Sequence, residues 1–243
     1  MRIKIVLSYD GTDFCGWQRQ KNGVSVQQTV EDAVYNLTGE KVTVTASGRT
    51  DAGVHAAGQV AHFDTNANIP PEKFYKALNT FLPDSVKALS SEKVSDDFNA
   101  RKNAKRKTYE YSLYVSDTEL PLKERYGSRV YGDVDLEKMR SCAKLLEGEH
   151  DFKAFSATGG NVKTSVRTVY GIVVEQNGID IKIKVTGNGF LYNMVRIIAG
   201  ALVKAGKGEL SERDIIKALE TGERNLLGET LPAKGLSLLK AEY

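Results

Sequence analysis

The stretch Ile3-Lys4-Ile5-Val6-Leu7-Ser8-Tyr9 decides how the first half of this 243-residue chain is interpreted. Its residues at positions 3, 5, 7 and 9 share one face of an extended chain, which predicts a half-buried β-strand. After a polar loop, Ser25 and Gln28 form a capping box at the start of a helix, and Gly39 ends that helix. The apolar stripe between these caps predicts that one face of the helix is buried.

Three further strands and a second helix are predicted within the first 100 residues. Residues 42–46 and 59–64 are expected to be strands separated by a glycine-flanked loop, and residues 86–94 a third strand. Pro70 and Pro71 open a helix expected to end at about residue 80, because proline suits the first helical turn. The order strand, helix, strand, strand, helix, strand is that of a split βαβ or ferredoxin-like unit.

The second half repeats this order approximately. Its predicted elements are a strand at 109–115, a helix capped by Asp135, strands at 169–175 and 179–185, a buried helix at 192–205, an amphipathic helix at 211–220 and a strand at 235–243. Asn177-Gly178 predicts a hairpin with a type I′ turn, since both residues tolerate positive φ. We therefore expect an α+β protein of two ferredoxin-like halves, residues 1–100 and 101–243, with antiparallel sheets joined around a central catalytic cleft.

Composition narrows the class of protein. Hydrophobic residues make up 41% and charged residues 27%, which is typical of an ordered globular chain. The apolar runs are too short to span a membrane and the start does not read as a signal peptide, so we expect a cytoplasmic protein. The chain has two cysteines, which are too few for a disulfide framework. These cysteines and the three histidines show no paired spacing of metal ligands, which argues against a metal site. His62 is interpreted as an ordinary strand-face residue.

Positive charge is unevenly distributed along the chain. Residues 1–100 hold 10 Lys+Arg against 12 Asp+Glu, and residues 101–243 hold 24 against 19. The densest run is Arg101-Lys102-Asn103-Ala104-Lys105-Arg106-Lys107, just ahead of Tyr109. Such a run is usually a solvated surface, but beside an RNA site it would contact the backbone and make affinity fall steeply with salt. Tyr109 itself fits the core of a half-buried strand.

The segment Gly48-Arg49-Thr50-Asp51-Ala52-Gly53-Val54-His55 contains the strongest candidate for chemistry. Its local pattern also fits an ordinary β-turn over residues 50–53. Arg49 offers a fixed positive charge that would keep the Asp51 carboxylate ionised, as a nucleophile requires. Spacing alone permits this role without establishing it.

This segment resembles the signature of the TruA family of tRNA pseudouridine synthases. Further blocks that resemble the family follow in family order and span nearly the whole chain: residues 9–20, 25–28, 190–196 and 232–236. The resemblance implies a homodimer that isomerises uridine to pseudouridine in the anticodon stem-loop of tRNA, typically at positions 38 to 40, with no cofactor and no metal.

The resemblance also implies roles for individual residues. Asp51 corresponds to the catalytic aspartate of the family, and Tyr109 to the tyrosine that stacks on the target base. Arg49 corresponds to the arginine that helps to extrude the nucleotide. Arg196 is carried over as a candidate ion-pair partner of Asp51, although it also fits a simple cap or bridge near a helix start. The sequence does not distinguish whether Asp51 first attacks C1′, attacks C6 or removes a sugar proton.

Three other functions are alternatives to this one. A noncatalytic RNA-binding protein would bind tRNA and leave uridine unchanged, and the intact Asp51 segment argues against it. A zinc deaminase would need a His/Cys ligand set and a Pro-Cys-x-x-Cys element, which this sequence lacks. A pseudouridine synthase that acts on a different RNA has the same chemistry and stays open at this stage.

Overall fold

The computed structural model describes residues 1–21, 23–159 and 163–243, and it has the predicted α+β class with mostly antiparallel strands. The chain divides into two compact units, Met1–Lys105 with Ser237–Tyr243, and Arg106–Leu236. This division differs from the predicted ranges 1–100 and 101–243. The reason is that β10 (Leu236–Glu242) pairs in parallel with a strand of the first unit, at Ser237–His55 and Leu238–Ala56.

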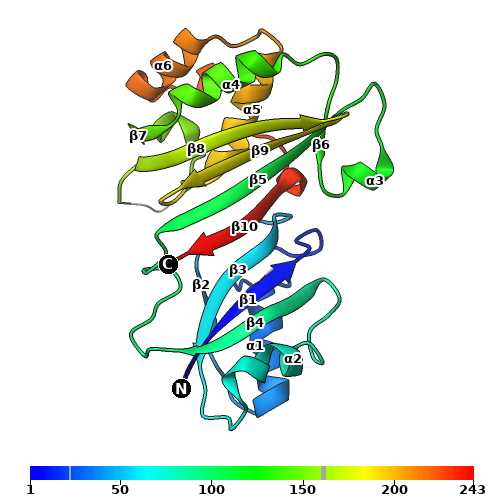
Figure 1. Cartoon of the computed structure of the whole chain (residues 1–243), viewed down its shortest axis with the longest axis vertical. Coiled ribbons are helices and arrows are strands. Elements are labelled where there is room, and N and C mark those ends of the chain that lie inside the picture. Colours follow the sequence, from blue (N-terminus) through cyan, green and yellow to red (C-terminus); the bar gives the residue numbers. More distant parts are fainter. Residues whose placement is uncertain (22, 160–162) are drawn as a thin grey trace. The chain divides into compact units, whose positions relative to one another are not determined.

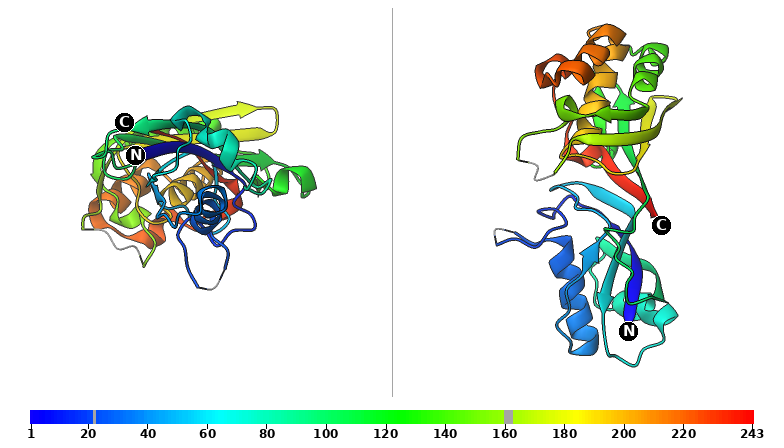
Figure 2. Two further views of the ribbon diagram at one scale, coloured as in Figure 1. Left: turned by 90° about the horizontal axis from the view of Figure 1, so that it is seen from below. Right: turned by 90° about the vertical axis from the view of Figure 1, so that its left-hand side faces the viewer.

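The first unit has the predicted order of strands and helices (Figure 1). Besides β10, its elements are β1 (Arg2–Tyr9), α1 (Val26–Thr38), β2 (Thr45–Ala46), β3 (His55–Asp64), η1 (Pro71–Lys73), α2 (Phe74–Leu78) and β4 (Val86–Val94). The antiparallel strands run in the order β4-β1-β3, and β2 pairs with β3. Figure 2 shows α1 lying along one face of these strands.

Burial follows the predicted patterns of β1 and α1. Ile3, Ile5 and Leu7 are fully buried on one face of β1, and each buried side chain of this size contributes about 1.5–3 kcal/mol relative to exposure. At the start of α1 the Ser25 side chain accepts a hydrogen bond from the Gln28 amide. Gly39 ends the helix with a φ of 75°, a left-handed conformation that suits glycine.

Two predicted elements of the first unit are shorter than expected. The strand predicted over 42–46 covers only Thr45–Ala46, because the Val44 amide donates to the Glu31 side chain instead of to a neighbouring strand. The helix predicted to run to residue 80 ends at Leu78. There the side chain of Asn79 bonds both the N–H and the C=O of Ala88, and so ties the end of the helix to β4.

The second unit contains a sheet and a group of helices. Its strands are β5 (Arg106–Val115), β6 (Ser128–Val130), β7 (Gly148–Asp151), β8 (Val166–Asn177) and β9 (Asp180–Gly187), and its helices are α3 (Pro121–Glu124), α4 (Leu136–Leu145), η2 (Lys153–Phe155), α5 (Met194–Gly206), α6 (Glu212–Thr221), η3 (Arg224–Leu227) and η4 (Ala233–Gly235). The order β5-β9-β8-β7 is antiparallel, and β6 runs parallel to β5. Helix α4 packs against α5, α6 and β8 (Figure 1).

The predicted hairpin between β8 and β9 is confirmed, but its predicted turn is wrong. Asn177 pairs with Asp180, so the two turn residues are Gly178 and Ile179. Of these, Gly178 has a positive φ, at 59°, and Ile179 does not. A type I′ turn requires positive φ at both positions. Asn177 therefore remains in the strand, and glycine alone supplies the reversal.

His62 lies on β3 and is almost fully buried. Its Nδ1 accepts a hydrogen bond from the Ala100 amide at 3.2 Å, which requires the neutral ring in the tautomer that carries its proton on Nε2. Burial is the main cause that lowers the pKa of His62, and the nearby charge of Arg2 lowers it further. The fold therefore favours neutral His62.

We predict that His62 makes the protein less stable in mild acid. Above a pH of about 6.5 the ring is neutral in both the folded and the unfolded chain. Its contribution to the free energy of unfolding is then fully present. As pH falls, the unfolded chain takes up the proton first, so stability is lost until the pKa of folded His62 is passed. Urea unfolding from pH 7.5 to pH 5 should show a larger loss for the wild type than for His62→Asn, which keeps an acceptor but does not titrate. Equal losses would contradict this assignment.

Candidate active site

The Asp51 turn, residues 51–54, lies between β2 and β3. The carbonyl of Asp51 accepts a hydrogen bond from the Val54 amide at 3.1 Å, and Gly53 has a φ of 78°. The turn therefore begins one residue later than the predicted turn over 50–53. Its third position requires positive φ, which explains the glycine. Asp51 is half-buried and Arg49 is exposed.

Thr50, which precedes the turn, is held on two sides. Its carbonyl accepts a hydrogen bond from the Trp17 amide at 2.9 Å. Its hydroxyl lies 2.8 Å from the hydroxyl of Tyr9 at the end of β1. Burial raises the pKa of Tyr9 to about 12, so this phenol keeps its proton at neutral pH. The backbone that leads into Asp51 is thus fixed to β1 and to the loop after it.

Gln59 holds the other end of the same segment. It is fully buried on β3, its Nε2 donates to the Gly48 carbonyl at 2.8 Å, and its Oε1 accepts from the Ser47 hydroxyl at 2.6 Å. Each of these bonds satisfies a polar group that would cost free energy if it were buried alone. The sequence prediction missed Gln59, because a glutamine in a strand does not reveal which loop its side chain will contact.

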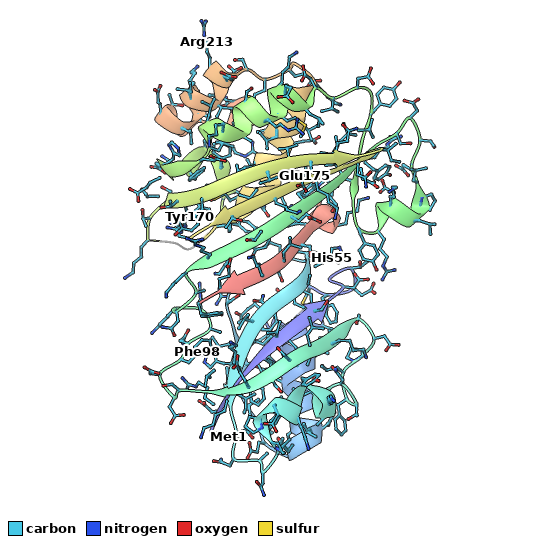
Figure 3. The ribbon with its side chains drawn as sticks, viewed as in Figure 1. Met1, His55, Phe98, Tyr170, Glu175 and Arg213 are labelled. Atoms are coloured by element: carbon cyan, nitrogen blue, oxygen red, sulfur yellow. The ribbon has the colours of Figure 1, made fainter. Side chains whose placement is uncertain are left out.

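Two glycines allow the loop at residues 10–17 to press against the Asp51 turn. A Cβ on Gly11 would lie 2.0 Å from the Val54 carbonyl oxygen, and a Cβ on Gly16 would lie 2.7 Å from that of Thr50. Gly16 also has a φ of 100°. The Gly11 amide donates a hydrogen bond to Nδ1 of His55 at 3.0 Å. His55 is the first residue of β3 (Figure 3). Only a residue without a side chain fits at either position.

Trp17 is a packing residue by its burial. It is 2% exposed, and its ring centroid lies 6.2 Å from that of Tyr9. This burial agrees with a packing anchor rather than with an RNA contact. The Trp17 amide donates to the carbonyl of Thr50, the residue before Asp51.

Tyr109 and Tyr111 lie on β5 in the second unit. Tyr109 is 8% exposed and packs edge-on against Phe190, with the ring centroids 5.3 Å apart. Tyr111 is fully buried, and its hydroxyl lies 2.8 Å from the Ser128 hydroxyl and donates to the Pro232 carbonyl at 2.7 Å. Tyr111 is therefore a core residue. The stacking role of Tyr109 stays a prediction.

Arg196 lies in the first turn of α5. Its Nε donates to the Leu231 carbonyl at 2.7 Å, and its Nη1 donates to Oδ1 of Asn193, the residue before the helix, at 2.8 Å. The alternative of a bridge near a helix start is therefore present in the structure. Its pairing with Asp51 stays a prediction.

The basic run at 101–107 is mostly exposed, as expected of a solvated surface or an RNA-binding segment. Arg106 places its guanidinium carbon 4.9 Å from the ring centroid of Tyr170, which projects from β8 (Figure 3). This cation–π contact lies within the second unit. Among the described residues, no group of three His, Cys, Asp or Glu side chains could hold a metal ion. No helix in the described ranges has both the length and the apolar character needed to cross a bilayer.

Comparison with known proteins identifies the family. A family model described as tRNA pseudouridine synthase matches residues 5–101 and 142–243. The chain is 44% identical to tRNA pseudouridine synthase A of Acetivibrio thermocellus over 241 residues, 99% of both chains. It is 44% identical to tRNA pseudouridine synthase A of Ruminiclostridium cellulolyticum over 244 residues, 100% of this chain and 99% of that one.

The chain belongs to the tRNA pseudouridine synthase family. The family membership predicted from the sequence is thereby confirmed. Asp51, Arg49 and Arg196 lie within the residues that the family model matches, whereas Tyr109 lies between the two matched ranges. Tyr109 is nevertheless inside the nearly full-length matches to the individual pseudouridine synthases.

We predict that the Tyr9–Thr50 hydrogen bond braces the Asp51 turn. Tyr9→Phe and Thr50→Val should each lower the free energy of unfolding by about 0.5–1.5 kcal/mol, with a coupling of about 1 kcal/mol in the double variant. Amide hydrogen exchange at Trp17 and Val54 should speed up in Tyr9→Phe. Tyr114→Phe, which removes a buried phenol bonded to Glu124 in the second unit, is the matched control. Additive effects and unchanged exchange would show that this bond does not brace the turn.

Proposed function

We propose that this protein isomerises uridine to pseudouridine in the anticodon stem-loop of tRNA, typically at positions 38 to 40. One observation carries the proposal: Asp51, in a segment with the family signature, directly follows residues 47–50, which Gln59 holds at one end and bonds to Thr50 hold at the other. Full-length similarity to proteins named tRNA pseudouridine synthase A supports tRNA as the substrate.

The reaction conserves every atom of the nucleotide. The C1′–N1 bond breaks, the base turns within the pocket, a C1′–C5 bond forms, C5 loses its proton and N1 gains one. No electrons are gained or lost overall, so the step requires no oxidant or reductant. A carboxylate held in place is suited to this chemistry, because no further conformational entropy is lost in orienting it towards the sugar in each turnover. The proposal assigns to Asp51 the first step on the nucleotide, at C1′, at C6 or at a sugar proton.

The uridine must leave the base stack before Asp51 can reach it. Extrusion costs about a few kcal/mol, and stacking on an aromatic side chain offsets part of this cost. We assign the stacking to Tyr109 and assistance in extrusion to Arg49, and we keep Arg196 as the candidate ion-pair partner of Asp51. The exposure of Arg49 supports its role, since an exposed guanidinium can meet RNA. The proposal includes a homodimer that acts on tRNA in the cytoplasm.

We predict that Asp51→Asn abolishes product formation while retaining tRNA binding. The asparagine keeps the size of the side chain and removes the charge needed for catalysis, so the rate should fall by at least about 1,000-fold. Unmodified tRNA incubated with each protein, without added metal or nucleotide, would be mapped for pseudouridine at every position. Asp32→Asn, which neutralises an exposed carboxylate on α1, is the matched control.

Three outcomes decide the proposal. Product from the wild type and from Asp32→Asn, but not from Asp51→Asn, supports both the reaction and the catalytic residue. Product from Asp51→Asn at an undiminished rate would remove Asp51 from the mechanism. Binding of tRNA without any product from the wild type would support the noncatalytic RNA-binding alternative.

A further inference from the structure

The first unit contains a cavity of about 260 Å³ whose wall includes Arg49. Its other walls come from the loop before α1, from α1, from the segment ending in β2 and, after β4, from Arg101. A water molecule occupies about 30 Å³ in the liquid, and drug-sized ligands need about 300–1,000 Å³. The cavity therefore has room for several waters or one small charged group, and it is too small to enclose a nucleotide.

The charge of the cavity is positive. Arg49 and Arg101 are the charged side chains among its described lining residues. Behind two of its lining residues lies the carboxylate of Glu31, which accepts hydrogen bonds from the Gln27 side chain at 2.9 Å and from the Val44 amide at 3.0 Å. Arg19 lies 3.2 Å from the same carboxylate and compensates its charge. The positive charge that lines the cavity is therefore that of two guanidiniums, which can attract an anion.

The backbone beside Arg101 is fixed although its side chain is exposed. Ala100 is fully buried, with its amide bonded to His62 and its carbonyl accepting a hydrogen bond from the Tyr243 hydroxyl at 2.7 Å. The side chain of Asn99 accepts from the Arg101 amide at 3.0 Å. These bonds set where the guanidinium of Arg101 can reach.

Tyr243 connects both sides of the cavity. Its ring lies 5.0 Å from that of Phe98, a residue placed after β4 (Figure 3). Burial raises the pKa of Tyr243, and a hydrogen bond with the Ser47 side chain opposes this rise. Ser47 begins the segment that leads to Arg49, whereas Ala100 precedes Arg101. One hydroxyl therefore lies against the segments that present the two arginines.

We propose that this cavity binds one phosphodiester group of the RNA substrate between Arg49 and Arg101, and that Tyr243 positions the two arginines. The inference rests on the proposed RNA substrate. A diester offers two anionic oxygens to the planar donor forks of two guanidiniums. A base is a poorer occupant, because the buried ring of Trp17 offers little surface for stacking.

The first test measures binding of an unmodified anticodon stem-loop RNA. Arg101→Gln should raise the Kd about 10-fold, and the loss should appear in KM rather than in kcat. The slope of log K against log salt should become shallower by about 1, as expected for the loss of one phosphate contact. Arg213→Gln removes an exposed arginine that projects from α6 (Figure 3), and it should change neither quantity by more than about twofold.

The second test replaces single phosphates of the RNA by neutral methylphosphonates. One linkage near the target uridine should weaken binding to the wild type about 10-fold, and the same linkage should have little effect on Arg101→Gln. Tyr243→Phe should weaken binding less than Arg101→Gln and should add nothing to it in the double variant. Thermal unfolding of each variant shows whether the protein is still folded.

The outcomes separate this inference from the proposed function. If the wild type makes pseudouridine but Arg101→Gln binds RNA like Arg213→Gln, the phosphate site is wrong and the function stands. If the wild type makes no pseudouridine, the function fails, and a linkage effect that disappears in Arg101→Gln still supports the site. If inorganic phosphate binds the wild type and not Arg101→Gln, with no linkage effect, the site takes a free anion and the proposal is overturned.

Discussion

The contact between the loop at residues 10–17 and the Asp51 turn is the constraint on which the site depends. Gly11 and Gly16 allow two backbones to approach so closely that any side chain at either position would collide with a carbonyl oxygen. The contact also lets the Trp17 amide and the Tyr9 hydroxyl reach Thr50. The position of Asp51 is therefore set by the close approach of two backbone segments and by buried hydrogen bonds of the neighbouring residues.

This arrangement separates support from chemistry. The supporting groups are buried and satisfied, whereas Asp51 is half-buried and Arg49 is exposed. Because the buried supporting residues are rigid, the accessible carboxylate is already in position. Less free energy is then needed to organise the site around an extruded nucleotide. In the same unit, His62 and Tyr243 bond the backbone of Ala100, next to the exposed Arg101. Here too, buried residues support an exposed candidate for RNA contact.

Local sequence patterns predicted most of the secondary structure and the segment that contains the site. Alternation identified β1, and the caps at Ser25 and Gly39 located both ends of α1. Local patterns could not reveal that Glu31 would take the Val44 amide and shorten β2, or that the reversal after β8 would use glycine alone. These outcomes depend on side chains that meet only in the folded chain.

The candidate site divides in the same way. The signature around Asp51 stood out by resemblance to a family, and the glycines near the start of the chain belonged to the same resemblance. Gln59 carried no local signal, and Arg101 was one of five basic residues in a run of seven. Only the folded backbone distinguishes Arg101 from its neighbours, because it brings this residue to the same cavity as Arg49.

The central claim is that the carboxylate of Asp51 meets the sugar or the base of the reacting uridine. A structure of the Asp51→Asn protein bound to an unmodified anticodon stem-loop tests it most directly. The account predicts that the uridine lies outside the base stack. Its C1′, its C6 or a sugar carbon that carries a hydrogen should lie within about 3.5 Å of the side chain at position 51. A uridine that stays stacked, or one that is extruded towards a different group, would contradict it.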